Sequence, residues 1–509
     1  MLRREERPPT PIAGLQRRVR RLAPEPVRRA DLALFRRVAA TRLPVVGWIL
    51  PVLSRMANHS RLWLGIAAVF ATFGGRGGRR AALRGLLSVA TTSTLTNLPA
   101  KLLTGRERPD LSVVPEVRHL ARIPSSTSFP SGHSASAFAF ATGAAMELPR
   151  VRVPLFGLAS AVAASRVYTG VHYPGDVAVG ATIGVAVAGA TARIWPLADP
   201  RPSTAEVAAD GTPLAEPDGS GIVLVANVGS GTALGERPEQ QLREALPGMR
   251  TIESHSGEQL PTLLVRAAGE ARVLGVAGGD GSAGAAAAAA HEAGIPLLVV
   301  AAGTLNHLAT DLGVDEVEAS IRAVKERRAI AMDLGDIDGR PFVNAASVGL
   351  YPHLVADREK LEGRIGKWPA ALWCLLRLLV TGRPTEVEVD GRPRRVWLLF
   401  FGNGIYRNEG LAPHRRTGLD NGKLDVRLVD AEVSWARTRL VASVLSGRRG
   451  RCLAYERWTA EQVEIRSLEG PLRVAQDGET WTGPEDFTVR TRPRALLVMQ
   501  PDPESSETD

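Results

Sequence analysis

Three short segments in the first 180 residues carry the side chains that an attack on a phosphate ester needs. They contain Lys101 with Arg108, the run Pro130–His133, and the run Ser165–Asp176. Arg and Lys can bind the equatorial oxygens of a phosphoryl group, and a histidine held by a carboxylate can attack phosphorus in line. This set of residues supplies that chemistry without a metal ion.

The spacing assigns a role to each candidate. His172 is the candidate nucleophile, and Asp176, four residues later, can hold one ring nitrogen so that the other faces phosphorus. His133 can protonate the leaving oxygen. Each motif is weak alone, since a Pro-Ser-Gly turn before a helix is common, but their order is informative. The phosphate-binding candidates are fixed cations and a turn before a helix: Lys101, Arg108, Ser131, Gly132 and Arg166.

A second phosphate-binding pattern, Gly-Gly-Asp-Gly-Ser, lies at 278–282. It follows an expected strand at 271–277 and precedes an expected helix at 283–290. Glycines expose backbone N–H groups, and a helix N-terminus adds positive potential. Asp280 can hold or orient Mg²⁺. The pattern is neither a P-loop, because no Gly-Lys-Ser/Thr follows, nor a dinucleotide fingerprint.

Two further glycine-bearing loops, 227–231 and 303–306, also follow expected strands at 221–227 and 295–301. Parallel strands present their carboxyl ends at one edge of a sheet, where ligands bind. The sequence therefore predicts one nucleotide site built from three loops. Its ATP-binding candidates are Asn227, Ser230, Gly231, Gly278, Gly279, Asp280, Gly281, Ser282, Gly303, Thr304 and Asn306.

Residues 43–197 must position the first site. Most of their apolar stretches are shorter than the ~20 residues of an isolated membrane span, but their small residues suit close helix packing in a bilayer. A buried soluble bundle is the alternative. The Arg clusters at 76–84 and 150–152 would lie in loops on one side, as cytoplasmic loops do. The stretches are Leu43–Ala57, Leu62–Gly75, Leu83–Leu103, Ser134–Leu148, Pro154–Ala164 and Val177–Leu197.

The remaining chain divides by composition. Residues 1–42 hold 12 Arg and 4 acidic residues of a chain with net charge +10. They predict a membrane-facing basic arm or a solvated tail, and they do not favour nucleic acid, because no aromatic residues are interleaved. Residues 198–220 predict a linker, 221–335 an α/β nucleotide-binding domain, and 336–500 a mostly β subdomain. The two cysteines, Cys374 and Cys452, require no disulfide, and abundant Ala, Gly and Arg indicate a bacterial origin.

The first set of motifs resembles the type 2 phosphatidic acid phosphatase superfamily over roughly 40–195. This resemblance implies an integral membrane enzyme that cleaves a lipid phosphate or pyrophosphate without a cofactor. It implies that His172 forms a phosphohistidine supported by Asp176 and that His133 is the general acid. All three signature motifs are present without departure.

The second set resembles the diacylglycerol kinase catalytic family over about 221–500. Asn344 with Gly349, the turn 420–424 and the run 477–479 also fit. The resemblance implies Mg-ATP as phosphate donor and Glu479 as base for the lipid hydroxyl. The candidate metal ligands are Asp280 and Asp420. Four positions depart from the family pattern: Val228 and Ala302 replace Pro, Ser282 replaces Thr, and His307 replaces Asp.

Together these features predict a multi-domain, bifunctional enzyme of the cell membrane. The alternative is a phosphatase with a catalytically silent, lipid- or nucleotide-binding kinase-like domain. Phosphatidate, diacylglycerol, sphingoid and polyprenyl phosphate substrates all stay open. Because all three phosphatase motifs lie at one end of the helices, that site is expected to face outward and the kinase domain, which needs ATP, to be cytoplasmic. Six spans are expected if 43–57 crosses, with the N-terminal arm then cytoplasmic.

Overall fold

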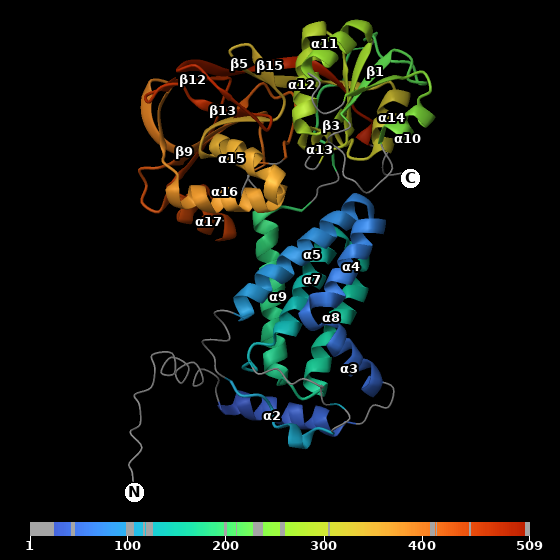
Figure 1. Cartoon of the computed structure of the whole chain (residues 1–509), viewed down its shortest axis with the longest axis vertical. Helices are drawn as coiled ribbons and strands as arrows, with labels where there is room; N and C mark the ends of the chain where they lie inside the picture. The colour runs from blue at the N-terminus through green and yellow to red at the C-terminus, as the bar shows by residue number, and fades with distance from the viewer. Residues whose placement is uncertain are drawn as a thin grey trace. The chain divides into compact units, whose positions relative to one another are not determined.

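The chain divides into two compact units, Met1–Ala198 and Asp199–Asp509, and each is considered by itself (Figure 1). The helical first unit and the α/β second unit agree with the predicted fold classes. The computed structural model describes residues 25–41, 46–97, 106–115, 118, 126–197, 201–209, 211–227, 238–254, 260–303, 306–407, 413, 415–446 and 449–503.

Every apolar stretch of the first unit contains a helix, and an additional helix, α2, precedes them. The helices are α2 (Glu25–Ala40), α3 (Val46–Met56), α4 (Arg61–Phe73), α5 (Gly75–Leu95), α7 (Gly132–Glu147), α8 (Arg152–Tyr168) and α9 (Pro174–Ile194), with 3₁₀ turns η1 (Asn58–Ser60), η3 (Leu111–Val113) and η5 (Pro149–Val151).

Small residues let the central helices α7 and α9 approach closely. A Cβ built on Gly184 would lie 2.2 Å from the carbonyl oxygen of Ala135, and one on Gly180 would lie 2.5 Å from that of Ser131. Glycine is therefore required at both positions for this contact. On the other side of α7, Phe140 packs against Trp63 in the core.

Within the described residues of this unit, one helix is long and apolar enough to cross a membrane. It is α9, with a mean hydropathy of 1.6 and 22% of its apolar window buried. The neighbouring helices also leave large apolar side chains exposed, among them Leu64, Phe73, Leu83 and Val153.

The Arg cluster at 76–84 does not form the expected loop. Gly75 begins α5, so these arginines are helical and lie at the end of the unit where α7 ends. Arg80 and Arg84 both pair with Glu147, at 2.9 and 2.7 Å, and both stack on Trp195. The carboxylate neutralises the buried guanidinium groups, which is why charged residues can enter this core.

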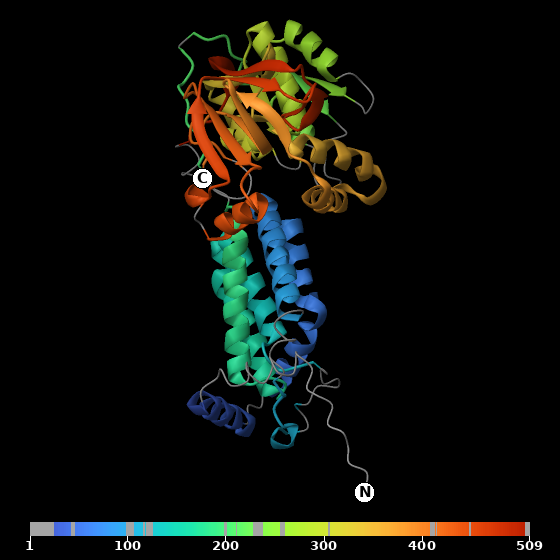
Figure 2. The ribbon, with the colours of Figure 1, turned by 90° about the vertical axis from the view of Figure 1, so that its left-hand side faces the viewer.

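The basic arm is also more ordered than expected, because its residues 25–40 form α2. Phe35 and Ala39 are buried, and Phe35 packs edge-on against Tyr173. This helix lies across the end of the unit that carries Tyr173, opposite the Glu147 end (Figures 1 and 2). Ser54 of α3 lies at the same end as α2, and α3, with 11 residues, rises only ~16 Å.

The second unit is built on one connected sheet. Its first strands pair in parallel in the order β2-β1-β3-β4, with helices packed on both faces. The elements are β1 (Ile222–Asn227), α10 (Pro238–Ala245), β2 (Arg250–Ser254), α11 (Leu260–Glu270), β3 (Val273–Gly278), α12 (Asp280–Ala293), β4 (Leu297–Ala301), α13 (His307–Leu312) and α14 (Val317–Lys325).

The β-rich remainder is mostly antiparallel. It comprises β5 (Ala329–Ile337), β6 (Arg340–Phe342), β7 (Ala345–Gly349), α15 (Leu350–Ile365), α16 (Lys367–Thr381), β8 (Thr385–Val389), β9 (Arg392–Asn403), β10 (Leu424–Asp430), α17 (Ala436–Ser446), η7 (Arg449–Arg451), β11 (Tyr455–Ala460), β12 (Gln462–Ser467), β13 (Arg473–Gln476), β14 (Glu479–Thr482) and β15 (Asp486–Met499). The last strand joins the two parts, since it pairs with β12 at one end and with β4 at Val498.

Part of the expected linker 198–220 belongs to the second unit. The backbone N–H of Ser203 donates to Asp311, and that of Glu206 donates to the Asp420 carboxylate. Ala208 donates to the carbonyl oxygen of Ala329. These bonds fix 203–208 along the domain surface, so the free connection is shorter than its composition indicates.

Candidate active sites

The structure brings the first-site residues together at one end of the helical unit. His172 lies in the turn between α8 and α9 and is 3% exposed. Its Nδ1 is 3.7 Å from the Asp176 carboxylate, an ion-pair distance too long for a hydrogen bond. Its Nε2 faces the Arg108 guanidinium at 3.4 Å. Nε2 therefore faces the cation that would bind a phosphate, whereas Nδ1 has no hydrogen-bond partner among the described residues.

The other candidates surround this pair. Ser131 caps the N-terminus of α7, where Gly132 is the first helical residue, and its N–H donates to the carbonyl oxygen of Asp176. The Nε2 of His133 lies 2.8 Å from Asn58 Oδ1, so η1 orients the candidate acid. Arg166 is buried and donates to Ser54 on α3. Lys101 lies outside the described residues.

The sequence did not indicate how strongly α2 contributes to this site. Arg106 donates to Asp176 at 2.7 Å and to Asp31 of α2 at 2.6 Å. Asp31 also accepts from the N–H of Gly175. The guanidinium of Arg106 stacks on Tyr173 at 4.1 Å. Arg106 stands within the first motif, but its partner Asp31 lies 75 residues earlier in the chain. The spacing of the motifs therefore could not predict this contact.

Electrostatics favour a neutral nucleophile. Burial, together with the positive charges of Arg166 and Arg108, lowers the pKa of His172 to about 4, although Asp176 opposes the shift. A ring that is neutral near pH 7 has a free lone pair, which nucleophilic attack requires.

An apolar groove of about 580 Å³ opens beside this end of the unit, between α3 and α4. Leu62, Gly65, Ile66 and Val69 line it, with Arg55, Met56 and Arg61 at its rim. Asn58, which contacts His133, lies between the two rim arginines in the sequence. The groove can therefore hold an apolar chain next to the candidate general acid.

The second site lies at the carboxyl edge of the parallel strands. Asn227, at the end of β1, donates to Ser282 on α12 at 3.1 Å. A Cβ on Gly303 would lie 2.4 Å from the Cα of Gly279, so the loops after β3 and β4 touch through their glycines. Asn306 adopts a positive φ and exchanges two hydrogen bonds with Gly303. Gly278 and Gly281 belong to the same turn, whereas Ser230, Gly231 and Thr304 lie outside the described residues.

Asp280 begins α12 and faces Asn344, which follows β6. Asn344 donates to Asp280 at 3.4 Å, and its own buried Oδ1 accepts no hydrogen bond from the described residues. Mg²⁺ in phosphoryl-transfer sites is held by one or two carboxylates and by the nucleotide phosphates. An acceptor oxygen without a donor beside a carboxylate therefore fits a nucleotide-bound Mg²⁺.

Asp420 does not share this position within the described chain. Its carboxylate accepts a hydrogen bond from the backbone N–H of Glu206 and lies near the buried Asp333. No cluster of three acidic, His or Cys side chains occurs in the described ranges.

The turn 477–479 lies directly against the glycine-rich loop. Asp477 accepts from the backbone N–H groups of 343, 344 and 345, which fixes this turn. Burial raises the pKa of Asp477 to about 6, although these three donors oppose the rise. A Cβ on Gly281 would lie 3.4 Å from Glu479 Oε1, so that carboxylate reaches the α12 N-terminus.

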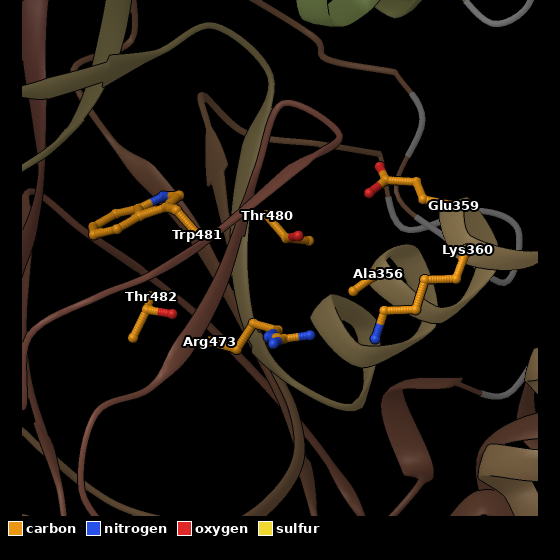
Figure 3. A pocket seen from close by; sticks show the side chains of 7 residues that line it. All are labelled: Ala356, Glu359, Lys360, Arg473, Thr480, Trp481 and Thr482. Atoms are coloured by element: carbon orange, nitrogen blue, oxygen red, sulfur yellow. The ribbon is translucent and has the colours of Figure 1, made fainter.

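A pocket of about 400 Å³ opens between α15 and the β13–β14 hairpin (Figure 3). Lys360 and Arg473 point into it from opposite walls, and Thr480 lines it on the side of Arg473. Because β14 begins at Glu479, the pocket adjoins the candidate base. It is a candidate space for the polar end of an acceptor.

Comparison with known proteins agrees with both sets of motifs. The PAP2 superfamily model matches residues 81–199, and the diacylglycerol kinase catalytic domain model matches 221–337. A lipid A 1-phosphatase of Rhizobium etli is 38% identical over 104 residues, which cover 18% of this chain and 43% of that protein.

The kinase match is longer. A probable lipid kinase YegS-like from Pseudomonas savastanoi is 30% identical over 285 residues, which cover 52% of this chain and 91% of that protein. A putative diacylglycerol kinase from Bacillus anthracis has 18% identity and a TM-score of 0.44, covering 55% of this chain and 97% of that structure. The Pseudomonas savastanoi match, which covers 91% of that protein, shows that the chain belongs to the lipid kinases of the diacylglycerol kinase catalytic family, and the match to the PAP2 superfamily model precedes this domain.

Proposed function

We propose that this chain is a bifunctional membrane enzyme that removes a phosphate from one lipid and transfers a phosphate from ATP to another. The observation that carries the proposal is that two separate phosphate sites occur in one chain. His172 with its cations forms the first, and the Gly278–Ser282 turn with Glu479 forms the second.

In the phosphatase, the cations bind the phosphate oxygens and His172 Nε2 attacks phosphorus. A P–N bond forms as the ester P–O bond breaks, and His133 gives its proton to the leaving lipid oxygen. Water then attacks the phosphohistidine while His133 takes the water's proton, which releases phosphate and restores the ring. Asp176 orients His172 and stabilises the positive ring of the intermediate.

In the kinase, the glycine-rich turn and the α12 N-terminus bind the ATP phosphates. Asp280, with Asn344, would hold Mg²⁺, which neutralises charge on the transferred phosphoryl group. Glu479 takes the proton of the lipid hydroxyl, whose oxygen bonds to the γ-phosphorus as ADP leaves. Ser282 keeps the hydroxyl of the threonine usual in the family. The lipid substrates of both sites are sought among phosphatidate, diacylglycerol, sphingoid and polyprenyl phosphate lipids.

The membrane setting rests on the apolar exterior of α9 and its neighbours and on the groove between α3 and α4. We propose five crossing helices: α4, α5, α7, α8 and α9. The phosphatase site then faces outward together with α2, and α9 leads inward to the kinase domain. The arginines of the 76–84 cluster, at the Glu147 end, then fall on the cytoplasmic side, as the positive-inside rule requires.

Two variants, each measured in a phosphatase assay and in a kinase assay, test the proposal. His172→Ala should abolish release of phosphate from a panel of lipid phosphates and leave transfer of labelled phosphate from ATP to lipids intact. Asp280→Asn should do the reverse. A wild-type protein that neither binds Mg-ATP in calorimetry nor phosphorylates any lipid would establish the alternative, a phosphatase with a silent kinase-like domain.

A further inference from the structure

The second unit carries an exposed apolar surface formed by α16 and by the region of α17 and η7. Its five large side chains, 46% to 83% exposed, are Trp373, Val380, Trp435, Val441 and Leu453. Arg437 joins the two helices, since it donates to the carbonyl oxygen of Leu378 at 3.4 Å and stacks on Trp397. In Figures 1 and 2 both helices lie outside the β-rich sheet. We call this set the basic apolar surface.

The exposed residues of α16 follow one helical stripe. Pro369, Trp373, Arg377 and Val380 are exposed, whereas Ala370 and Cys374, roughly a quarter turn round the helix, are buried. The stripe is an apolar face interrupted by one cation. Soluble surfaces rarely expose two tryptophans and a valine this fully without a partner.

The charge of the same segments is of one sign. Residues 363–385 and 433–455 contain no Asp or Glu. Among the described side chains of these segments, Arg377 forms an ion pair, lying 4.0 Å from Asp357 on α15. The segments contain four and five cations, which are Arg364, Lys367, Arg377 and Arg383, then Arg437, Arg439, Arg448, Arg449 and Arg451.

Exposed tryptophans, aliphatic side chains and cations without acids are the features of a protein face that lies in the headgroup region of an anionic bilayer. We propose that the basic apolar surface docks the kinase domain on the anionic leaflet of the membrane that holds the first unit. This inference rests on the proposed membrane setting.

The covalent connection makes such docking accessible. Pro196 accepts from Arg80 and Arg84 in the first unit, and Ser203 is bonded to Asp311 in the second. The six residues between them can extend over roughly 25 Å at most. A kinase domain on this tether stays near one leaflet, and docking would keep it close to lipid hydroxyls that never leave the bilayer.

The test uses the full chain in nanodiscs, with Cys374→Ser and Cys452→Ser as background. Nitroxide labels are placed at Val380→Cys, at Leu453→Cys, and at Val265→Cys as a control. Val265 is a matched control because it is 56% exposed on α11, away from the surface. Labels at 380 and 453 should collide with lipid-soluble oxygen more than with an aqueous nickel complex, more strongly in anionic than in zwitterionic nanodiscs. The label at 265 should show the opposite preference.

An aqueous label at 380 in both nanodisc types would overturn the proposal. So would a label shielded from both reagents, because it would mean that protein covers this face. These readouts do not need kinase activity, so they separate failure of docking from failure of the kinase assignment.

Measurements of kinase and phosphatase activity provide a second test. Val380→Asp with Leu453→Asp should lower phosphorylation of bilayer lipid about tenfold, corresponding to ~1.4 kcal/mol. Transfer to a water-soluble short-chain diacylglycerol and phosphatase turnover should stay unchanged. Val265→Asp should alter neither activity. Equal loss on soluble and bilayer acceptors would contradict a docking role.

Discussion

At the phosphatase site one carboxylate serves two positive partners. Asp176 accepts from Arg106 at 2.7 Å and faces His172 at 3.7 Å, so the fixed cation holds the carboxylate more tightly than the nucleophile does. Asp31 shares that cation and thereby leaves Asp176 partly free for His172. The balance among these charges decides how well the carboxylate supports a positive ring.

Asp31→Asn should therefore reduce phosphatase kcat. Without the α2 carboxylate, Arg106 interacts with Asp176 alone, and the phosphohistidine step loses support, by about tenfold if ~1.4 kcal/mol is lost. The KM for the lipid phosphate should change little, since Asp31 touches no phosphate-binding residue. Asp31→Glu should recover part of the rate. A proportional fall in folded protein for both variants would instead indicate a purely structural role.

The low pKa of His172 predicts an acid-tolerant phosphatase. Only the neutral ring attacks, so activity is lost as the pH falls through the pKa. That loss should come near pH 4, where burial and the neighbouring cations place the pKa, and not near 6.5, the ordinary value.

The pH profile of kcat/KM measures this, after subtraction of the substrate's own titration. Arg108→Gln should move the acid limb upward, because removal of a nearby positive charge raises the pKa of a base. A wild-type limb at about pH 6.5 would show that the ring is not desolvated as the structure has it.

Sequence spacing predicted the residues that form the core of each site, because motifs at 101–108, 130–133 and 165–176 define it locally. It did not predict Asp31, Ser54 or Asn58, which come from α2, α3 and η1 and carry no motif. Their roles depend on how distant helices meet. Asp280 and Asp420, the two candidate metal ligands, have different described neighbours: Asp280 lies beside Asn344, and Asp420 accepts from the backbone N–H of Glu206.

At the scale of elements, α7 and α9 meet through glycine. Gly184→Ala should disrupt this packing, because its Cβ would lie 2.2 Å from a backbone oxygen of α7 that cannot rotate away. Overpacking of this kind costs about 1–3 kcal/mol, and phosphatase activity should fall because α9 also carries Asp176. Gly189→Ala on the same helix meets nothing within 4 Å and is the control. Thermal denaturation in detergent compares the two; equal melting temperatures would contradict the close contact.

The loops of the nucleotide site meet in the same way. Gly303→Ala should displace the 278–282 turn, since its Cβ would lie 2.4 Å from the Cα of Gly279. A misplaced phosphate donor costs about 10²-fold in rate, so kinase activity should fall while phosphatase activity is retained. Gly269→Ala, in open space on α11, should change neither and can add up to ~1 kcal/mol of stability. Unchanged kinase kinetics in Gly303→Ala would mean that the turn is not the phosphate cradle.

The sequence predicted some of the helices and strands. Apolar stretches predicted the helices of the first unit, and glycine-ended strands predicted the parallel sheet. The helix α2 was not predicted, because its four arginines mask the apolar positions that Phe35 and Ala39 occupy. The role of β15 was also missed, since pairing with β4 and β12 joins residues that are far apart along the chain.

For the whole molecule, the position of α2 supports the five-crossing arrangement proposed above. The site end carries α2 and the candidate phosphatase residues, whereas α9 leaves from the end that carries Glu147. In that arrangement α2 and the kinase domain lie on opposite sides of the membrane. The phosphatase would act on the outer leaflet and the kinase on the inner one, so a lipid must flip between them or each site must use its own pool.

Cysteine accessibility in intact cells tests this arrangement, in a background without Cys374 and Cys452. An impermeant maleimide should label Cys at Ala33 on α2 and at Val113 on η3, because both positions lie at the site end and are exposed. It should label Cys at Ala293, exposed at the end of α12, only after the cells are permeabilised. Labelling at 113 without labelling at 33 would instead support six spans, with the N-terminal arm in the cytoplasm. Labelling at 293 in intact cells would place the kinase domain away from its ATP and refute the joint assignment of the two units.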